Sequence, residues 1–393
     1  MQLKRLGIVS DCVHFITREG DFATYNHVLL RQFEALAMHF EEVVICCPFI
    51  EEDCAVYSKY TAVNIKFLKA KPAGGDTFKA KVDIIKKIPG WVSLYRQLNK
   101  TSDIVYLRFP NNISIPAFFY FRLMGKKMFA TFTGPWDTDS YSSFSTNMQI
   151  LLLKYFFKGP VWVYSKFENN KPDIIKSYSP SYTEKVWMEE SENVSEKIQS
   201  FATGKLRCLK MISVGSLNER KNHQYLLQTC VQLKNADIPF ELTIAGTGIL
   251  ETELKAFIHE NLLGHAVKLA GKVSYNGLRA LFRSNDFVVQ SPLSEGYGKV
   301  PVEGFFHGLI PILSNTSLFA NEMTGNNERG FVFDVHDSSS LFKILYSIWN
   351  EDTKAWLPAF ILNGRDYAKQ LTIERWANEY AATVEQYFGK NKL

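Results

Sequence analysis

Short apolar runs alternate with longer amphipathic stretches along almost the whole chain, and this alternation limits its possible folds more than any other feature. In the first half, runs of strand length are Leu6–Ser10, Glu42–Cys47, Asn64–Leu68, Asp103–Arg108, Lys127–Phe132 and Val161–Ser165. The stretches between them have apolar residues at helical spacing, as residues 23–39 do with Leu29, Phe33 and Leu36. Strands that alternate with helices predict parallel sheets covered by helices, the α/β class.

A polar stretch without clear periodicity, Glu189–Lys205, interrupts the alternation near the middle of the chain. The alternation then restarts with the runs Leu206–Val214, Glu241–Ala245, Val267–Ala270, Asp286–Gln290, Ile310–Ser314 and Phe331–Phe333. A chain of 393 residues has room for two or three domains of roughly 150 residues each. We therefore predict two α/β domains, residues 1–200 and 206–372, joined by this linker.

The composition is that of a soluble globular protein, with 46% hydrophobic and 22% charged residues. No apolar run approaches the roughly 18 residues that a transmembrane helix needs, and Leu6–Ser10 is too short for the core of a signal peptide. The six cysteines form no Cys-x-x-Cys pair and no metal-ligand spacing, which favours buried thiols in a reducing compartment. We expect a cytoplasmic protein.

The segment Ser291–Gly308, "SPLSEGYGKVPVEGFFHG", has the most informative spacing of residues. A strand leads into a loop with Gly296 and Gly298, and a helix begins near Pro301. The free amides at the start of such a helix suit an anion such as a diphosphate. Glu295 and Glu303 bracket this loop, and a carboxylate can accept both hydroxyls of a vicinal diol such as ribose.

With "GLIPILS" after it, this E-x7-E pattern resembles the retaining family called glycosyl transferases group 1, or glycosyltransferase family 4. The resemblance covers about residues 206–390 well and the first half only weakly. A second match is "SVGSLNERKNHQYLL", Ser213–Leu227, where the family has a Gly-Arg-Leu and then a Lys. Gly215 and Lys221 match this second motif, whereas Ser216 stands where the Arg is expected.

The resemblance implies roles for these residues. Glu303 would hold the nucleotide ribose, Glu295 would contact the donor sugar, and Lys221 would grip the diphosphate. Arg220 either supplies the charge missing at Ser216 or is a solvated charge at a helix start. The turns Gly246-Thr247-Gly248 and "GKVS" also fit, and relatives read the base through the second turn. The implied donor-site residues are therefore Gly215, Ser216, Arg220, Lys221, Val273, Ser274, Glu295, Gly296, Tyr297, Gly298 and Glu303.

The family also implies the GT-B fold, two Rossmann-like parallel-sheet domains facing each other across a cleft, with residues 373–393 returning to the first domain. The implied reaction moves a hexose-type sugar from a nucleoside diphosphate sugar to a hydroxyl of a glycan or lipid-linked acceptor, with retention. No cofactor and no metal are expected, because Lys221 and loop amides would balance the charge on the phosphates. Two alternatives stay open: a catalytically silent sugar-nucleotide-binding subunit, and an epimerase-like enzyme of the same fold.

The first half is expected to bind the acceptor, yet it departs from the family. Gly20 alone represents the usual glycine-rich loop, and Thr133 stands where relatives often have a His. Nearby candidates are Trp136, which either stacks on a sugar or plugs the domain, together with Asp137 as a catalytic residue and Asp139. Asp137-Thr138-Asp139 also matches the metal-binding tripeptide of GT-A glycosyltransferases, which lack the second-half motifs.

Basic residues are concentrated in residues 71–100, which contain seven Lys or Arg against two Asp. No nucleic-acid-binding signature accompanies this charge, so we expect no nucleic-acid partner. Phe78, Val82 and Ile85, and then Trp91, Leu94, Tyr95 and Leu98, lie at helical spacing, with Pro89-Gly90 between them as a predicted break. The window suits peripheral contact with an anionic membrane, such as the inner face of the plasma membrane. Alternatively, these apolar stripes face the core and the lysines are merely solvated.

Overall fold

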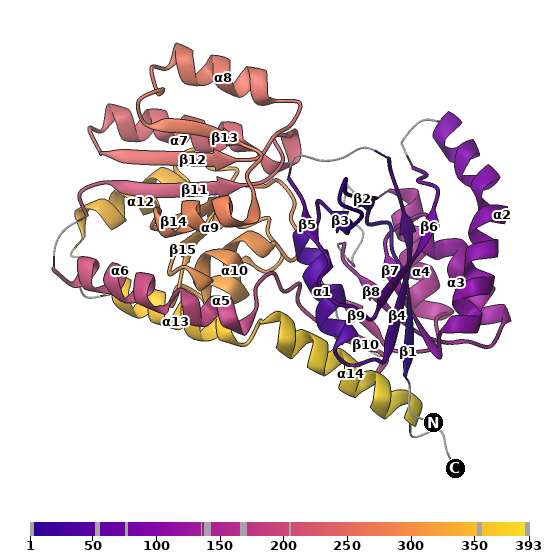
Figure 1. Cartoon of the computed structure of the whole chain (residues 1–393). Coiled ribbons are helices and arrows are strands. Elements are labelled where there is room, and N and C mark those ends of the chain that lie inside the picture. Colours follow the sequence, from indigo (N-terminus) through magenta and orange to yellow (C-terminus); the bar gives the residue numbers. More distant parts are fainter. Residues whose placement is uncertain are drawn as a thin grey trace. The chain divides into compact units, whose positions relative to one another are not determined.

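The computed structural model describes residues 4–51, 56–74, 78–134, 136, 143–165, 171–203, 206–351 and 356–389, with backbone alone for 78–81 and 203. The chain divides into two compact units (Figure 1). The first contains the residues up to Pro180 and those from Ile373 onward, and the second is Ser181–Thr372. The final helix, α14 (Ile373–Gly389), thus belongs to the first unit.

The predicted linker is wrong in position, because the division lies at Pro180 and residues 189–205 belong to the second unit. Most of them form helix α6 (Ser191–Thr203), which follows α5 (Glu184–Glu189). The helix is mostly polar because it buries only one narrow stripe. Val194 and Phe201, seven positions apart on one face, join the core of the second unit.

The first unit is built on a seven-stranded sheet in the order β10-β9-β8-β7-β1-β4-β6, in which every pairing is parallel. Its strands are β1 (Arg5–Val9), β4 (Glu42–Pro48), β6 (Ile65–Ala70), β7 (Ile104–Phe109), β8 (Lys127–Phe132), β9 (Val161–Val163) and β10 (Ile174–Lys176). A small antiparallel sheet joins β2 (Phe15–Ile16), β3 (Phe22–Thr24) and β5 (Ser58–Lys59). The parallel sheet was predicted, whereas β10 and the antiparallel sheet were not.

Helices cover both faces of this sheet (Figure 1). On one face α2 (Phe78–Thr101), α3 (Ser114–Leu123) and α4 (Phe144–Tyr155) pack over alternate strand residues such as Val105 and Leu107. On the other face α1 (His27–Ala37) and α14 pack over Ile104 and Tyr106. The period of two along each strand thus sends its apolar residues into two separate cores.

Helix α2 continues through Pro89, so the predicted break at Pro89-Gly90 is wrong. Proline leaves the carbonyl four residues earlier without its helical partner, but Ile85, Pro89 and Gly90 are exposed, where water can solvate it. Trp91 and Tyr95 are buried in the core and hold the second half of the helix in place. For this stripe the core-packing alternative is therefore confirmed.

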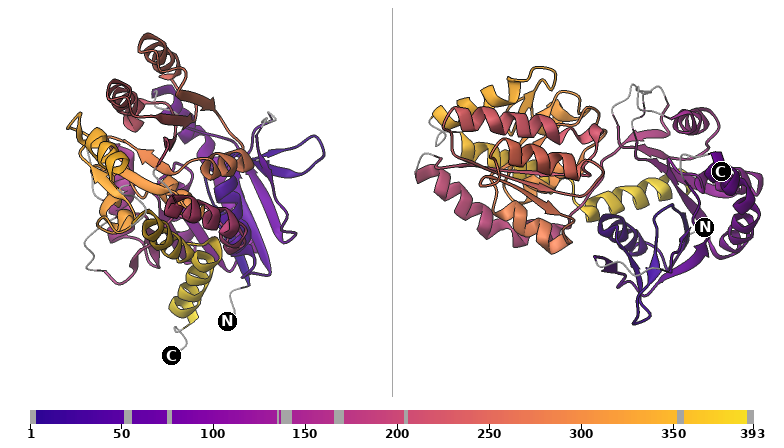
Figure 2. Two further views of the ribbon diagram at one scale, coloured as in Figure 1. Left: turned by 90° about the vertical axis from the view of Figure 1, so that its left-hand side faces the viewer. Right: turned by 90° about the horizontal axis from the view of Figure 1, so that it is seen from above.

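The second unit has a six-stranded parallel sheet in the order β13-β12-β11-β14-β15-β16, with helices on both faces (Figure 2). Its strands are β11 (Leu209–Val214), β12 (Phe240–Ala245), β13 (Val267–Gly271), β14 (Phe287–Gln290), β15 (Ile310–Ser314) and β16 (Phe331–Phe333). Its remaining helices are η1 (Glu219–Lys221), α7 (His223–Asn235), α8 (Glu251–Glu260), α9 (Tyr275–Arg283), α10 (Lys299–Phe306), α11 (Ala320–Thr324), α12 (Ser340–Asn350) and α13 (Leu357–Lys369). The prediction of two Rossmann-like α/β domains is confirmed. Within the described ranges, no helix combines the length and apolarity needed to span a membrane.

Candidate active site

In the sheet of the second unit, the order in which successive strands are added reverses between the neighbouring strands β11 and β14. From β11 the chain continues through α7 to β12 on one side, and from β14 it continues through α10 to β15 on the other. The loops that leave these two strands diverge at their carboxyl ends. In open α/β sheets a ligand crevice forms at this point, and both predicted donor-site motifs lie there.

The loop after β11 brings a lysine back over its own backbone. A Cβ at Gly215 would lie 3.2 Å from Cε of Lys221, so glycine leaves room for the lysine side chain. Asn218 starts the short helix η1 by accepting a hydrogen bond from the Lys221 amide at 3.1 Å. Ser216 is exposed beside them. The lysine position is therefore set by local backbone structure.

The loop after β14 brings Glu295 to this lysine. Lys221 Nζ and a Glu295 carboxylate oxygen form an ion pair in which both side chains are largely buried. Arg220 donates from Nη1 to the Ser294 carbonyl at 3.0 Å and lies 3.7 Å from the same Glu295 oxygen. Two cations thus meet one carboxylate, and an anionic ligand would find one uncompensated positive charge here.

Helix α10 follows this loop, so its first turn lies near the carboxyl end of β14. Gly298 has φ +64°, a left-handed backbone conformation that favours glycine, and directly precedes the helix. Tyr297 is buried against Phe319, with ring centroids 5.1 Å apart, which anchors the loop. Glu303 lies inside α10 and is 7% exposed. The free amides of the first turn suit an anion, and a carboxylate lies close behind them.

The turn after β12 packs directly on the lysine loop. A Cβ at Gly246 would lie 1.9 Å from the Gly215 carbonyl oxygen, and one at Gly248 would lie 2.2 Å from that of Leu217. Both positions need glycine, because any Cβ atom there would overlap with the backbone of the lysine loop. Val273 and Ser274 lie between β13 and α9, where the Ser274 hydroxyl caps α9 by accepting a hydrogen bond from the Gly277 amide at 3.1 Å. The cap thus fixes the backbone of Val273 and Ser274 at the start of α9.

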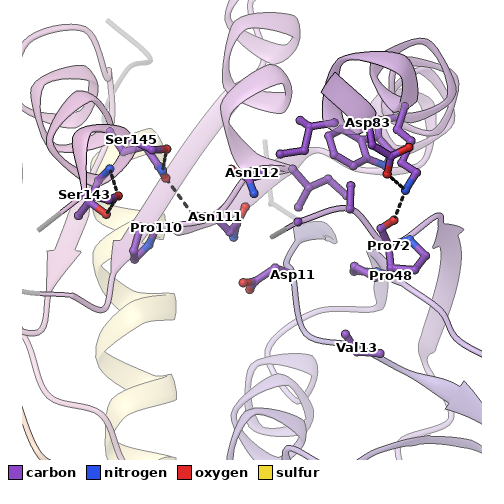
Figure 3. A pocket seen from close by; sticks show the side chains of 18 of the residues that line it. Asp11, Val13, Pro48, Pro72, Asp83, Pro110, Asn111, Asn112, Ser143 and Ser145 are labelled. Carbon is purple, nitrogen blue, oxygen red and sulfur yellow. Dashed lines mark hydrogen bonds and ion pairs between the residues drawn. The ribbon is translucent and has the colours of Figure 1, made fainter. Parts of the chain in front are cut away.

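The first unit contains a pocket of about 900 Å³ at the carboxyl ends of its own central strands. Asp11 follows β1, Pro48 ends β4, and residues 110–113 follow β7. Figure 3 shows the Asp11 side chain pointing into this space, across from Asn111. The pocket walls partly desolvate the carboxyl group and raise its pKa, although the charge of Arg108 opposes this shift.

Polar side chains on the other walls are held by hydrogen bonds. The backbone amide of Asn111 donates to Gln149 Oε1 at 2.9 Å. On another wall, Lys87 Nζ donates to the Pro72 carbonyl at 2.6 Å and pairs with Asp83 (Figure 3). A pocket of this size with fixed amides and a carboxylate suits a polyhydroxylated ligand. Sequence reasoning missed these residues, since only their places at strand ends could have indicated them.

The predicted acceptor residues that the structure describes lie outside this pocket lining. Gly20 forms the exposed turn between β2 and β3, and the Thr133 amide donates to the Phe109 carbonyl at 2.9 Å. Trp136 is 2% exposed and packs on Phe132 in the core, as the plugging alternative requires. Asp137 and Asp139 lie outside the described residues. Among the described residues, no group of three or more His, Cys, Asp or Glu is arranged to hold a metal ion.

Comparison with known proteins identifies the second unit. The family model for glycosyl transferases group 1 matches residues 196–355, a range that includes every donor-site motif above. These residues, all within the second unit, are similar to the glycosyl transferases group 1 family. Helix α10, its preceding loop and the lysine loop all lie within the matched range.

Two proteins with similar sequences are themselves named as glycosyltransferases. The N-acetylgalactosamine-N,N'-diacetylbacillosaminyl-diphospho-undecaprenol 4-alpha-N-acetylgalactosaminyltransferase of Campylobacter jejuni is 25% identical over 266 residues, 66% of this chain and 70% of that protein. The putative colanic acid biosynthesis glycosyltransferase WcaL of Escherichia coli is 26% identical over 156 residues, only 38% of each chain.

Solved structures match the whole length of this glycosyltransferase. Sucrose-phosphate synthase from Thermosynechococcus elongatus has a TM-score of 0.73 at 14% identity and covers 98% of this chain and 99% of its own. Anabaena HepE in complex with UDP has a TM-score of 0.69 at 13% identity, with 98% and 100% covered. These likenesses, together with the two parallel-sheet units, show the GT-B fold.

Proposed function

We propose that this glycosyltransferase moves a hexose-type sugar from a nucleoside diphosphate sugar to a hydroxyl of a glycan or lipid-linked acceptor, with retention at the anomeric carbon. The observation that carries the proposal is the group of charged side chains and glycine-rich backbone at the carboxyl ends of β11 and β14. There Lys221 and Arg220 contact Glu295 of the loop that leads into α10, and Glu303 lies within that helix. A diphosphate matches the cations and amides, and a ribose diol matches the carboxylate.

In the proposed reaction the protein stabilises the charge that develops on the leaving diphosphate. Lys221 and the amides before α10 are held in place before the reaction, so little reorganisation is needed. The Lys221–Glu295 pair would open when the donor binds, which frees the lysine for phosphate and Glu295 for sugar hydroxyls. The leaving diphosphate would help deprotonate the acceptor on the same face.

We assign the acceptor to the first-unit pocket around Asp11. Its carboxyl group offers hydrogen bonds to sugar hydroxyls, beside a wall that the hydrogen bond from the Asn111 backbone amide to Gln149 holds in place. The Campylobacter jejuni relative carries a diphospho-undecaprenol acceptor in its name, and the Escherichia coli relative is named for colanic acid biosynthesis. Both names support an acceptor from lipid-linked glycan or polysaccharide synthesis.

Thermal unfolding with UDP, GDP and ADP tests the donor site. A ligand at one hundred times its dissociation constant stabilises the native state by about 2.7 kcal/mol, so one nucleotide should raise the melting temperature clearly. Glu303→Ala and Lys221→Ala should each reduce that shift, and Lys343→Ala, an exposed lysine of the same unit, should leave it intact. Unchanged nucleotide affinity in folded Glu303→Ala protein would remove the ribose role.

Activity in excess EDTA tests the metal-independent form of the proposal. Because Lys221 and backbone amides would supply the positive charge, donor hydrolysis and transfer should persist without divalent cations. Loss of activity that manganese restores would instead favour a metal site at Asp137 and Asp139.

A silent sugar-nucleotide-binding subunit is the second candidate, favoured by Ser216 and Thr133 in place of the Arg and His of relatives. It predicts nucleotide binding without donor hydrolysis or transfer. Release of nucleoside diphosphate from a donor by purified protein would exclude it, and inverted configuration at a sugar carbon without release would indicate the epimerase-like alternative.

A further inference from the structure

Helices α3 and α4 of the first unit expose large apolar side chains on their outer faces. On α4, Phe144, Met148, Leu151 and Tyr155 follow one another at spacings of four, three and four residues, and are 84%, 42%, 54% and 65% exposed. Ile150 and Leu153 are buried on the opposite face. Helix α4 is therefore apolar on the face that points away from the core as well.

The end of α3 continues this apolar face. Phe119 and Leu123 are 58% and 79% exposed, while Phe118 and Phe121 face the core. The carboxyl ends of the two helices touch, because Arg122 Nη1 donates to the Phe156 carbonyl and the Phe118 and Phe157 rings lie 5.8 Å apart. We call this area the α3–α4 surface; it consists of Phe119, Leu123, Met124, Phe144, Met148, Leu151, Tyr155 and Phe156.

Within α3, α4 and the turns that follow them all formal charges are positive, although Asp137 and Asp139 precede α4 in the sequence. Residues 104–134 and 143–165 contain no Asp or Glu. Arg122, Lys154 and Lys158 belong to the two helices or directly follow α4. Lys126 instead donates to the Asn99 and Ser102 carbonyls, and Lys127 donates to the Phe388 carbonyl of α14. A second copy of the chain packed on the same surface would bring like charges together, which disfavours self-association.

We propose that the α3–α4 surface docks on an anionic lipid bilayer. Its aromatic and aliphatic side chains would enter the boundary between head groups and acyl chains, and its basic residues would meet lipid phosphates. The predicted window at residues 71–100 fits less well, because Trp91, Tyr95 and Leu98 are buried and Lys87 is paired with Asp83. The bilayer contact is thus assigned to the two helices after that window.

The surface also borders the first-unit pocket. Phe144 belongs to the surface and lines the pocket with Ser143 and Thr146. A docked first unit would therefore hold the pocket rim at the level of lipid head groups. A lipid-linked acceptor could keep its chain in the bilayer while its sugars enter the pocket. This last step rests on the proposed function, whereas bilayer docking does not.

Vesicle sedimentation without donor or acceptor tests the docking separately from the proposed function. The full chain should sediment with vesicles of phosphatidylglycerol mixed equally with phosphatidylcholine, and much less with phosphatidylcholine alone or in high salt. Leu123→Gln combined with Leu151→Gln should weaken binding by roughly tenfold or more, since both side chains leave water on docking. Both positions are exposed and outside the pocket lining, so the variant should fold and bind nucleotide normally.

The matched control is Met38→Gln combined with Val63→Gln. These residues are 84% and 99% exposed; Met38 directly follows α1, which covers the other face of the sheet, and Val63 lies in the loop before β6. This variant should sediment like the wild type. The proposal is overturned if the α3–α4 variant sediments like the wild type, or if the control loses as much binding. It is also overturned if light scattering finds a wild-type dimer that the α3–α4 variant dissociates.

Discussion

Arg220 and Lys221 are adjacent in sequence but have different surroundings. The Lys221 side chain is 13% exposed and pairs with Glu295, whereas that of Arg220 is 42% exposed and also holds the Ser294 carbonyl. Arg220 therefore connects the lysine loop with the loop after β14. This contact gives it a route to the diphosphate in a chain that has Ser216 where the family has Arg.

Arg220→Ala should reduce donor affinity nearly as much as Lys221→Ala. A charge-assisted contact to phosphate is worth about 1.5–3 kcal/mol, or roughly ten- to hundredfold in affinity. Nucleotide affinity and turnover of the single variants measure this, with Lys343→Ala as the control. If one cation suffices, Arg220→Ala should be silent and Ser216→Arg should tighten binding, and that result would contradict the expectation.

Three buried histidines should make the protein sensitive to mild acid. Burial lowers the pKa of His14, His223 and His307 to about 4 each, so the native state favours the neutral ring. Above about pH 6.5 the rings are neutral in both states and the full stability of the native state is present. As the pH falls from 6.5 toward 4, the unfolded chain binds protons that the native state does not, and the free energy of unfolding decreases. At pH 5 each ring should cost about 2 kcal/mol relative to pH 7.

Thermal unfolding at pH 7 and pH 5 measures this loss. His14 contacts the Cys12 carbonyl and the Tyr60 hydroxyl, both at 2.8 Å, and His14→Gln should lose less stability between the two pH values than the wild type. His336→Gln, at an exposed position, should keep the wild-type pH dependence. Equal pH dependence in all three proteins would show that buried imidazoles do not govern it.

At this scale the sequence located the second-unit site better than the first-unit pocket. Two short motifs make up the second-unit site, and each is the loop that follows one strand. They contain Gly215 and Lys221 after β11, and Glu295 and Gly298 after β14. The pocket takes Asp11, Asn111 and Gln149 from separate parts of the chain, and only the strand order brings them together. A pattern in one sequence does not give that order.

Among the loops, the turn after β12 is the most tightly constrained. Gly246 has φ +150°, and a Cβ there would meet the Gly215 carbonyl. Gly246→Ala should destabilise the second unit by more than about 2 kcal/mol, because left-handed strain adds to the clash. Gly264→Ala is the matched control, since its Cβ would meet nothing within 4 Å. Calorimetry should find a lower melting temperature for the first variant alone.

The predicted elements were most accurate where burial decided them. Apart from β10, the strands of both central sheets were found within a few residues, because each is a short, mainly apolar run. The errors lie where tertiary contacts outweigh local signals: Pro89 is tolerated in α2, and the polar α6 is held by Val194 and Phe201. The strand β10 has only three residues, too few for a periodic signal.

At the scale of the whole molecule, the first unit depends on a helix from the far end of the chain. Tyr380 of α14 is fully buried and stacks on Trp162 with ring centroids 3.9 Å apart, and Trp376 Nε1 donates to the Tyr164 hydroxyl at 3.0 Å. These contacts cover one face of the first sheet. The sequence indicated this helix only through the family resemblance.

Tyr380→Ala should destabilise the first unit by about 3–5 kcal/mol, the usual cost of removing a buried aromatic ring. The transition of the second unit, recognised by its nucleotide-dependent shift, should stay in place. Glu379→Ala, at an exposed position of the same helix, is the control. A variant in which both transitions fall together would show that the two units unfold as one.

The place of α14 also determines the order in which a ribosome can complete the two units. Residues up to Pro180 emerge first, but their sheet lacks α14 until all of Ser181–Thr372 has been translated. At ordinary elongation rates that interval lasts on the order of 10–40 seconds, during which Trp162 and Tyr164 lack their cover. The second unit is contiguous and can fold within this time. We therefore expect the nascent first unit to expose aromatic surface of the kind that chaperones bind until α14 has been synthesised.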